Sequence, residues 1–255
     1  MTGDKILLVN ADDFGFTSDV NAGIVEAFER GIVRSATLMA NGAAFDDAIR
    51  LARAHPELDV GCHLTLVQGP GLPSSLPELI GAIARRRIRI HEELAAQVQR
   101  ILDAGLRPTH LDTHKHTHLL PPVLEVVCRI AREFGIPWVR CPFDFSPRGG
   151  GRALCLWRPY VRRALRRGGC RTTDHFAGYA LTGRLDTARL VRLIRSLPAG
   201  TTELMCHPGR CGPELASART RLKASREREL EALCAPEVRE ALQATRAQLV
   251  SYREL

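Results

Sequence analysis

The stretch KILLVNADDFGFTSDVNAGIVEAFERG, residues 5–31, decides the fold of this sequence. Its first residues, 5–10, have the apolar pattern of a buried β-strand, and the polar residues 10–15 follow directly. Residues 19–30 then space their apolar side chains as a helix does, and Gly31 is a suitable helix end. A buried strand followed by a helix is the repeating unit of parallel α/β proteins.

The same unit recurs along the chain. Further strands are predicted at residues 35–40, 58–64, 109–113, 137–141, near 172–176 and 202–206, and helices at 45–55, about 91–104, 121–134 and 186–196. Loops at 67–77 and 144–152, a basic helix after the second loop, and helices up to about residue 248 complete the prediction. The alternation predicts a single α/β domain over residues 1–255, an irregular TIM-like (β/α) barrel. A doubly wound open sheet is the alternative, although no nucleotide-binding glycine motif follows a strand.

Composition and charge restrict the class of protein. The 255 residues carry a net charge of +8, and 45% of them are apolar. No apolar run reaches the roughly 18 residues of a membrane span, and no secretory signal precedes the first strand. We therefore expect a cytoplasmic protein without an integral membrane segment. The eight cysteines lack CxxC spacing and suit buried free thiols.

Arginines gather after the loop at 144–152. They are Arg158, Arg162, Arg163, Arg166, Arg167 and Arg171. Their spacing indicates the solvated face of a helix, and a patch for anionic lipid or phosphate is the alternative, so peripheral membrane association stays open. Aromatic residues make up only 5% of the chain, which argues against a nucleic-acid partner. A homodimer is an open alternative to a monomer.

Four polar clusters follow predicted strands, and in a parallel sheet such positions share the edge at which active sites lie. The richest cluster alternates four histidines and one aspartate between His110 and His118. In an extended chain this period of two places all five side chains on one face. Burying so many polar groups without a function would be costly. The other clusters are residues 10–15, 61–63 and 206–209.

Carboxylates and imidazoles together form a ligand set for Zn²⁺ and other divalent metals. A catalytic metal polarises a water molecule and a carbonyl oxygen, and a second carboxylate can act as general base. A histidine can protonate the leaving group near neutral pH. Because the clusters contain each of these groups, the sequence predicts a metal-dependent hydrolase.

The chain resembles the YdjC-like carbohydrate deacetylases at these residues. The matching stretches are VNADDFGFTSDVNAGI, GIVRSATLMANG, GCHLTL, PTHLDTHKHTHLLP and ELMCHPG. The similarity spans nearly the whole chain and is weakest over residues 145–200. The resemblance implies an irregular (β/α) barrel related to the polysaccharide deacetylases. It also implies roles for five residues: metal ligands Asp13, His63 and His114, catalytic base Asp12 and general acid His207.

Other residues are expected around this set. Four of them should orient the ligands or contact substrate: Asp112, His116, His118 and Arg140. His110, which comes earliest in its strand, should serve packing. Adjacent Asp12 and Asp13 would point to opposite sides of a regular strand. Both reach one site only if the chain bends, which nearby Gly15 would permit.

The predicted reaction removes an N-acetyl group from an amino sugar, in an oligosaccharide or a glycolipid, and leaves acetate and a free amine. The predicted cofactor is one divalent ion, Mg²⁺ or Zn²⁺. The alternative is a metal-dependent phosphoesterase acting on a sugar or nucleotide phosphate. It would use a second metal ion, for which Asp112, His116 and His118 are candidate ligands. A nucleic-acid or anionic-membrane binder, driven by the charge of +8, is the alternative from another class.

Overall fold

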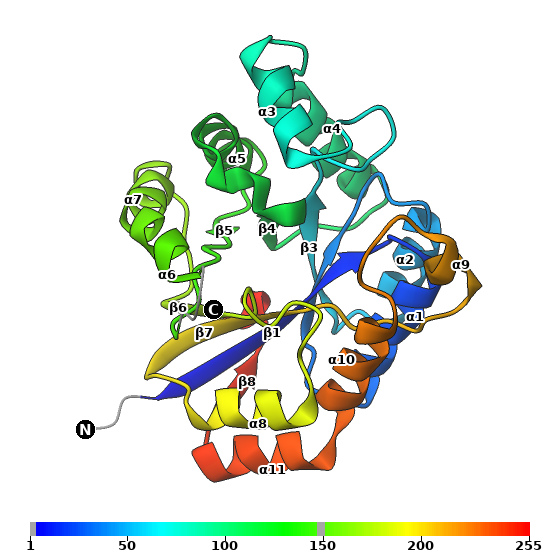
Figure 1. The fold of residues 1–255 in the computed structure, drawn as a ribbon, viewed down its shortest axis with the longest axis vertical. Coiled ribbons are helices and arrows are strands. Elements are labelled where there is room, and N and C mark those ends of the chain that lie inside the picture. The colour runs from blue at the N-terminus through cyan, green and yellow to red at the C-terminus, as the bar shows by residue number, and fades with distance from the viewer. Residues whose placement is uncertain (1–3, 147–150) are drawn as a thin grey trace.

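A curled parallel β-sheet organises the molecule, and β1 lies in its middle (Figure 1). The computed structural model describes residues 4–146 and 151–255. The strands are β1 (Lys5–Phe14), β2 (Ser35–Leu38), β3 (Asp59–Leu64), β4 (His110–Thr113), β5 (Trp138–Val139), β6 (His175–Ala177), β7 (Gly200–Cys206) and β8 (Gln248–Val250). Their order is β5-β4-β3-β2-β1-β7-β6, and β8 pairs with the beginning of β1.

The helices lie around the outside of this curve (Figure 1). The α-helices are α1 (Ser18–Glu29), α2 (Phe45–Ala54), α3 (Leu76–Ala84), α4 (Ile90–Asp103), α5 (Pro121–Glu133), α6 (Gly151–Leu154), α7 (Arg158–Arg167), α8 (Thr187–Arg195), α9 (Pro213–Ser217), α10 (Ala224–Cys234) and α11 (Pro236–Thr245). The short 3₁₀ helices of the described residues are η1 (His114–Leu119), η2 (Cys155–Trp157) and η3 (Tyr252–Glu254).

Strand β1 is buried along most of its length. Leu7, Leu8 and Val9 have no exposed surface, because strands flank β1 on both edges and side chains cover both faces. Its residues Lys5–Ala11 pair in parallel with β7, and Asn10 begins the pairing with β2. A continuous apolar run instead of an alternating one is typical of such a central parallel strand.

The predicted parallel α/β class is confirmed, but a closed TIM-like barrel is not established. The sheet is a half-barrel whose path ends at β5 on one side and β6 on the other. Within residues 4–146 and 151–255, isolated bridges rather than a continuous ladder link these two ends: Trp138 with Arg171 and Asp144 with Phe176. The predicted loop at 144–152 falls partly on residues 147–150, which lie outside the described residues.

Two regions differ from the sequence-based prediction. Residues 76–84 form α3 beyond the predicted loop, where Ser75 caps the helix by accepting the N–H of Glu78 and Pro77 occupies its first turn. The C-terminal segment forms the predicted helices, which end at Thr245, and the chain then adds the short strand β8 beside β1, which was not predicted. In the part of the chain that is described, no helix combines the length and apolar character needed to cross a membrane.

Candidate active site

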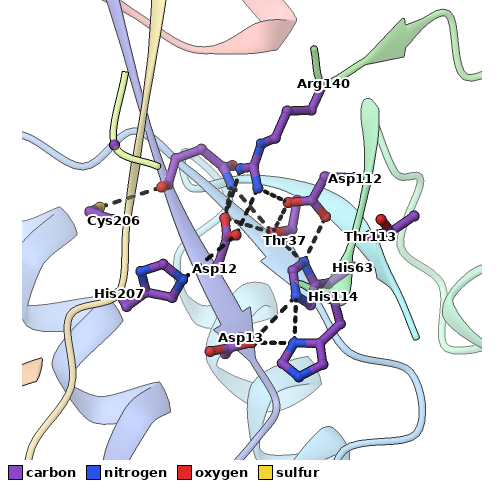
Figure 2. Close-up of polar contacts among 12 residues, drawn as sticks. Asp12, Asp13, Thr37, His63, Asp112, Thr113, His114, Arg140, Cys206 and His207 are labelled. Atoms are coloured by element: carbon purple, nitrogen blue, oxygen red, sulfur yellow. Dashed lines mark hydrogen bonds and ion pairs between the residues drawn. The ribbon is translucent and has the colours of Figure 1, made fainter. Parts of the chain in front are cut away.

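The carboxyl end of β1 supplies two adjacent carboxylates to one site. The pairing of β1 with β2 shifts register between Ala11 and Phe14. Asp13 there has a φ of 69°, in the left-handed region. Such a conformation is uncommon outside glycine and clusters at functional sites. The expected bend is therefore present, but it lies at Asp13 itself, and it lets Asp12 and Asp13 approach the same cluster (Figure 2).

Asp13, His63 and His114 meet at the carboxyl edge of the sheet (Figure 2). Asp13 Oδ1 lies 3.3 Å from His63 Nε2 and 3.3 Å from His114 Nδ1, and those two nitrogens are 3.2 Å apart. Asp13 and His63 are almost fully buried. The structure thus brings together three side chains that could share one metal ion, with ligand atoms within 4.8 Å of one another.

Asp112 contacts His63 at the ring nitrogen that does not face Asp13. Its Oδ1 lies 2.7 Å from His63 Nδ1, and its Oδ2 accepts the Thr37 hydroxyl at 3.1 Å. Burial lowers the pKa of His63, but the Asp112 carboxylate outweighs burial and raises that pKa to about 10. With Nδ1 engaged in this way, Nε2 is the ring nitrogen that faces Asp13.

Arg140, at the end of β5, connects three buried carboxylates. It donates to both oxygens of Asp12 at 2.7 Å and to Glu203 at 2.6 Å, and it pairs with Asp112 at 2.5 Å. Burial raises the pKa of Asp12, but the charge and hydrogen bonds of Arg140 hold it well below its usual range. One guanidinium thus gives all three buried carboxyl groups a charged partner.

The cluster from His110 to His118 does not share one face, so the predicted period of two is wrong there. Strand β4 ends at Thr113, and Lys115 and His116 adopt left-handed conformations with φ of 55° and 53°. The chain coils into η1 instead of continuing extended. Of the histidines beyond Thr113, only His114 joins the cluster with Asp13 and His63 within the described residues.

The other members of this segment serve different purposes. His110 Nε2 bonds Asn10 at 2.9 Å and its ring stacks on Tyr252 with centroids 3.9 Å apart, so it is a packing residue as predicted. His118 is held between the Thr113 hydroxyl at 2.6 Å and the carbonyl of Arg140 at 3.1 Å. His116 lies away from the three ligand candidates, with its ring 5.4 Å from that of Tyr179.

His207, directly after β7, also lies close to Asp12. Its Nε2 is 4.0 Å from Asp12 Oδ2 (Figure 2). Burial lowers the pKa of His207 to about 4. Burial therefore favours the neutral ring, and the general-acid role that the family resemblance implies for His207 stays a prediction.

Two charged residues of α10 also reach the site and were missed by sequence reasoning. Arg226 pairs with Asp13 Oδ2, and Glu229 accepts the backbone N–H of His207 at 2.6 Å. Burial raises the pKa of Glu229 to about 7. In the sequence they belong to the run ASRERELEALC, whose alternating charges are typical of a solvated helix.

A cleft of about 690 Å³ opens beside Asp13 and His114. Its lining includes the apolar side chains of Phe16, Met39 and Leu72 together with polar residues such as Gln68 and Thr220. A mixed apolar and polar cleft next to perturbed titratable groups is the usual setting of a substrate site.

The fold and the site together define a class of protein: a parallel α/β protein with a carboxylate–histidine centre at the carboxyl edge of its sheet. Residues 6–244 match the family model described as YdjC-like protein. The chain belongs to this family, as its sequence motifs predicted.

Relatives of known name cover most of the chain. It is 34% identical to a carbohydrate deacetylase of Brevibacillus brevis, over 98% of this chain and 99% of that protein. It is 35% identical to a chitooligosaccharide deacetylase of Klebsiella pneumoniae, over 80% of this chain and 82% of the other. A crystal structure from Enterococcus faecalis, provisionally named a cellobiose-phosphate cleavage protein, aligns with a TM-score of 0.77 at 28% identity over 99% of both chains.

Proposed function

We propose that this protein is a divalent-metal-dependent hydrolase that removes the N-acetyl group of an amino sugar and releases acetate and a free amine. The observation that carries the proposal is the grouping of Asp13, His63 and His114, with ligand atoms within 4.8 Å of one another. Asp12 groups with His63 as well, and His207 lies 4.0 Å from Asp12, which supports Asp12 as the base and His207 as the acid. The relatives named carbohydrate deacetylase and chitooligosaccharide deacetylase support an acetylated sugar as substrate.

The residues fit a metal ion. Asp13 Oδ1 is buried and has no hydrogen-bond partner within the described chain, yet it faces ring nitrogens of His63 and His114 at 3.3 Å. An ion shared by these atoms would satisfy all three. Of the two predicted metals, two imidazoles and one carboxylate suit Zn²⁺ better than Mg²⁺, which prefers oxygen ligands.

A bound divalent ion would polarise the acetyl carbonyl and lower the pKa of a water molecule. Asp12 accepts the proton of the attacking water, because Arg140 keeps its carboxylate ionised and fixes both oxygens. The low pKa of Asp12 makes it a weak base, and once protonated it is a strong acid. It therefore passes the proton on readily.

His207 delivers the proton to the leaving nitrogen. Amide hydrolysis stalls unless the leaving nitrogen is protonated, because an amine anion is a very poor leaving group. His207 is neutral before reaction, so its proton arrives during turnover from Asp12, whose Oδ2 is 4.0 Å from Nε2. The same ring nitrogen then donates to the leaving nitrogen.

The alternative phosphoesterase is not favoured by this site. It would use two metal ions about 4 Å apart. Asp12, His63 and Asp112 form a second group with ligand spacing, but the Arg140 guanidinium already binds Asp12 and Asp112. The Arg140 guanidinium thus occupies the position that a second metal ion would need.

Acetate release tests the proposed reaction directly. We expect acetate from at least one of N-acetylglucosamine, chitobiose-type oligomers and acetylated glycolipids, and we expect chelation to abolish the release until metal is restored. The measurement is acetate formed per enzyme over time, with bound metal determined in the same samples. Full activity after removal of the metal, or phosphate release from a sugar phosphate without any acetate, would contradict the proposal.

Replacing the proposed acid should slow the amide reaction selectively. His207→Gln should keep the metal but lower the turnover of the acetylated sugar by roughly 10²-fold to 10⁴-fold, the usual range for general acid–base catalysis. An activated acetyl ester such as 4-nitrophenyl acetate needs no proton on its leaving group. Its hydrolysis should therefore be almost unchanged. Equal damage to the amide and the ester would argue against the acid role of His207.

A further inference from the structure

Helix α10 buries two charged side chains on one face. Arg226 and Glu229 are each 1% exposed, whereas Arg228 and Glu231 on the same helix are exposed. Residues three apart share a helix face, so both buried side chains point into the molecule. Because a buried charge is costly without a partner, the groups that these residues contact indicate what they do.

Arg226 contacts one oxygen of Asp13 and leaves the other free. Its Nη2 donates to Asp13 Oδ2, and its Nε donates to the carbonyl of Leu222 at 3.3 Å. Asp13 Oδ1 faces His63 and His114 at 3.3 Å and has no hydrogen-bond partner in the described chain. With Oδ2 occupied, Oδ1 is the oxygen of Asp13 that remains for a cation.

Glu229 contacts the segment that carries His207. Its Oε2 accepts the backbone N–H of His207 at 2.6 Å, and its Oε1 accepts the backbone N–H of Gly183 at 3.0 Å. Oε2 also lies 4.0 Å from His207 Nδ1, while Nε2 of the same ring lies 4.0 Å from Asp12. The Glu229 carboxylate therefore fixes the backbone of His207 on the side of the residue that faces away from Asp12.

We propose that α10 positions both halves of the active site: Arg226 limits Asp13 to a single metal-binding oxygen, and Glu229 fixes His207 with its ring toward Asp12. The inference rests on the function proposed above. Both are positioning residues, because each acts through another side chain. For Arg226 the sign of the effect is diagnostic, since simple charge repulsion predicts tighter metal binding when the arginine is removed, whereas loss of orientation predicts weaker binding.

Metal affinity tests the role of Arg226. Zn²⁺ titrated into the metal-free protein should bind about 10-fold to 100-fold more weakly to Arg226→Met, the usual cost of losing a group that orients a ligand. Arg226→Lys, which keeps a donor and the charge, should recover most of that affinity, and the exposed control Arg228→Met should match wild type. The visible spectrum of the Co²⁺ form should change in Arg226→Met alone, because the carboxylate is then free to bind through either or both oxygens. Unchanged or tighter Zn²⁺ binding by Arg226→Met would overturn this half of the proposal.

The rate at constant metal occupancy tests the role of Glu229. Glu229→Gln should lower kcat by about 10-fold with KM and Zn²⁺ affinity close to wild type, because an interaction realised in the reaction has been disturbed. The exposed control Glu231→Gln should be unaffected. If the glutamine variant does not fold, Glu229→Asp, which keeps the charge but not the reach, gives the same comparison. A normal kcat in the folded variant would overturn this half.

The outcomes separate the inference from the function on which it rests. If the wild-type protein binds no Zn²⁺ and releases no acetate, the proposed function fails. If wild type does both and the α10 variants behave like it, only the positioning role fails.

Discussion

Replacing Asp13, His63 or His114 by alanine should reduce bound metal from about one ion per chain to almost none and abolish acetate release. Each side chain offers one of the three candidate ligand atoms that lie within 4.8 Å of one another. Removing one leaves two ligands, too few for a catalytic site that also keeps a position open for water. Metal content of the dialysed protein, measured with activity on the same samples, checks the prediction.

Two other histidines serve as controls. His91 lies on the surface beside Glu133, so His91→Ala should keep both metal and activity. His118 is bonded to Thr113 and to the carbonyl of Arg140, so His118→Ala should lower thermal stability but keep the metal. If His114→Ala retained full occupancy while His118→Ala lost it, the assignment within this segment would be wrong.

The sequence could predict the position of the candidate site in the fold, because its polar residues fall at the ends of predicted strands. The clusters at residues 10–15, 61–63 and 206–209 lie at the carboxyl ends of β1, β3 and β7. The edge shared by parallel strands brings such segments together without knowledge of any side-chain contact. The half-barrel was harder to predict. Whether the two end strands of the sheet, β5 and β6, pair with each other depends on long-range contacts, and no local sequence pattern shows that only isolated bridges link them.

Two features of the site could not be predicted from local patterns. The alternation from His110 to His118 favours a strand, but two consecutive left-handed residues, Lys115 and His116, turn the chain into η1. Periodicity describes a regular backbone and does not reveal where one ends. Arg226 meets Asp13 across 213 positions of the sequence, and its surroundings in the chain resemble those of a surface residue. Only tertiary packing distinguishes it from the exposed Arg228.

Replacing Asp12 by asparagine should leave the metal bound and lower turnover by roughly 10²-fold to 10⁴-fold, since asparagine keeps the shape of the side chain and cannot accept the proton of water. The substitution also removes a charge from the Arg140 network, and breaking a buried ion pair costs about 3–5 kcal/mol. Thermal unfolding must therefore be followed beside the rate, and turnover measured well below the melting temperature.

Glu203→Gln separates the loss of the base from the loss of a buried ion pair with Arg140. Glu203 accepts from Arg140 at 2.6 Å, as Asp12 does at 2.7 Å, but it does not contact the three candidate metal ligands or His207 within the described chain. The glutamine variant should thus lose stability without a comparable loss of rate. A similar fall of turnover in both variants would assign the effect to the position of Arg140, and near-normal turnover in Asp12→Asn would remove Asp12 as the base. Slow turnover confined to Asp12→Asn, with metal retained, is the result expected of a base, because Asp12 is the carboxylate that combines the Arg140 pairing with a position 4.0 Å from His207 Nε2.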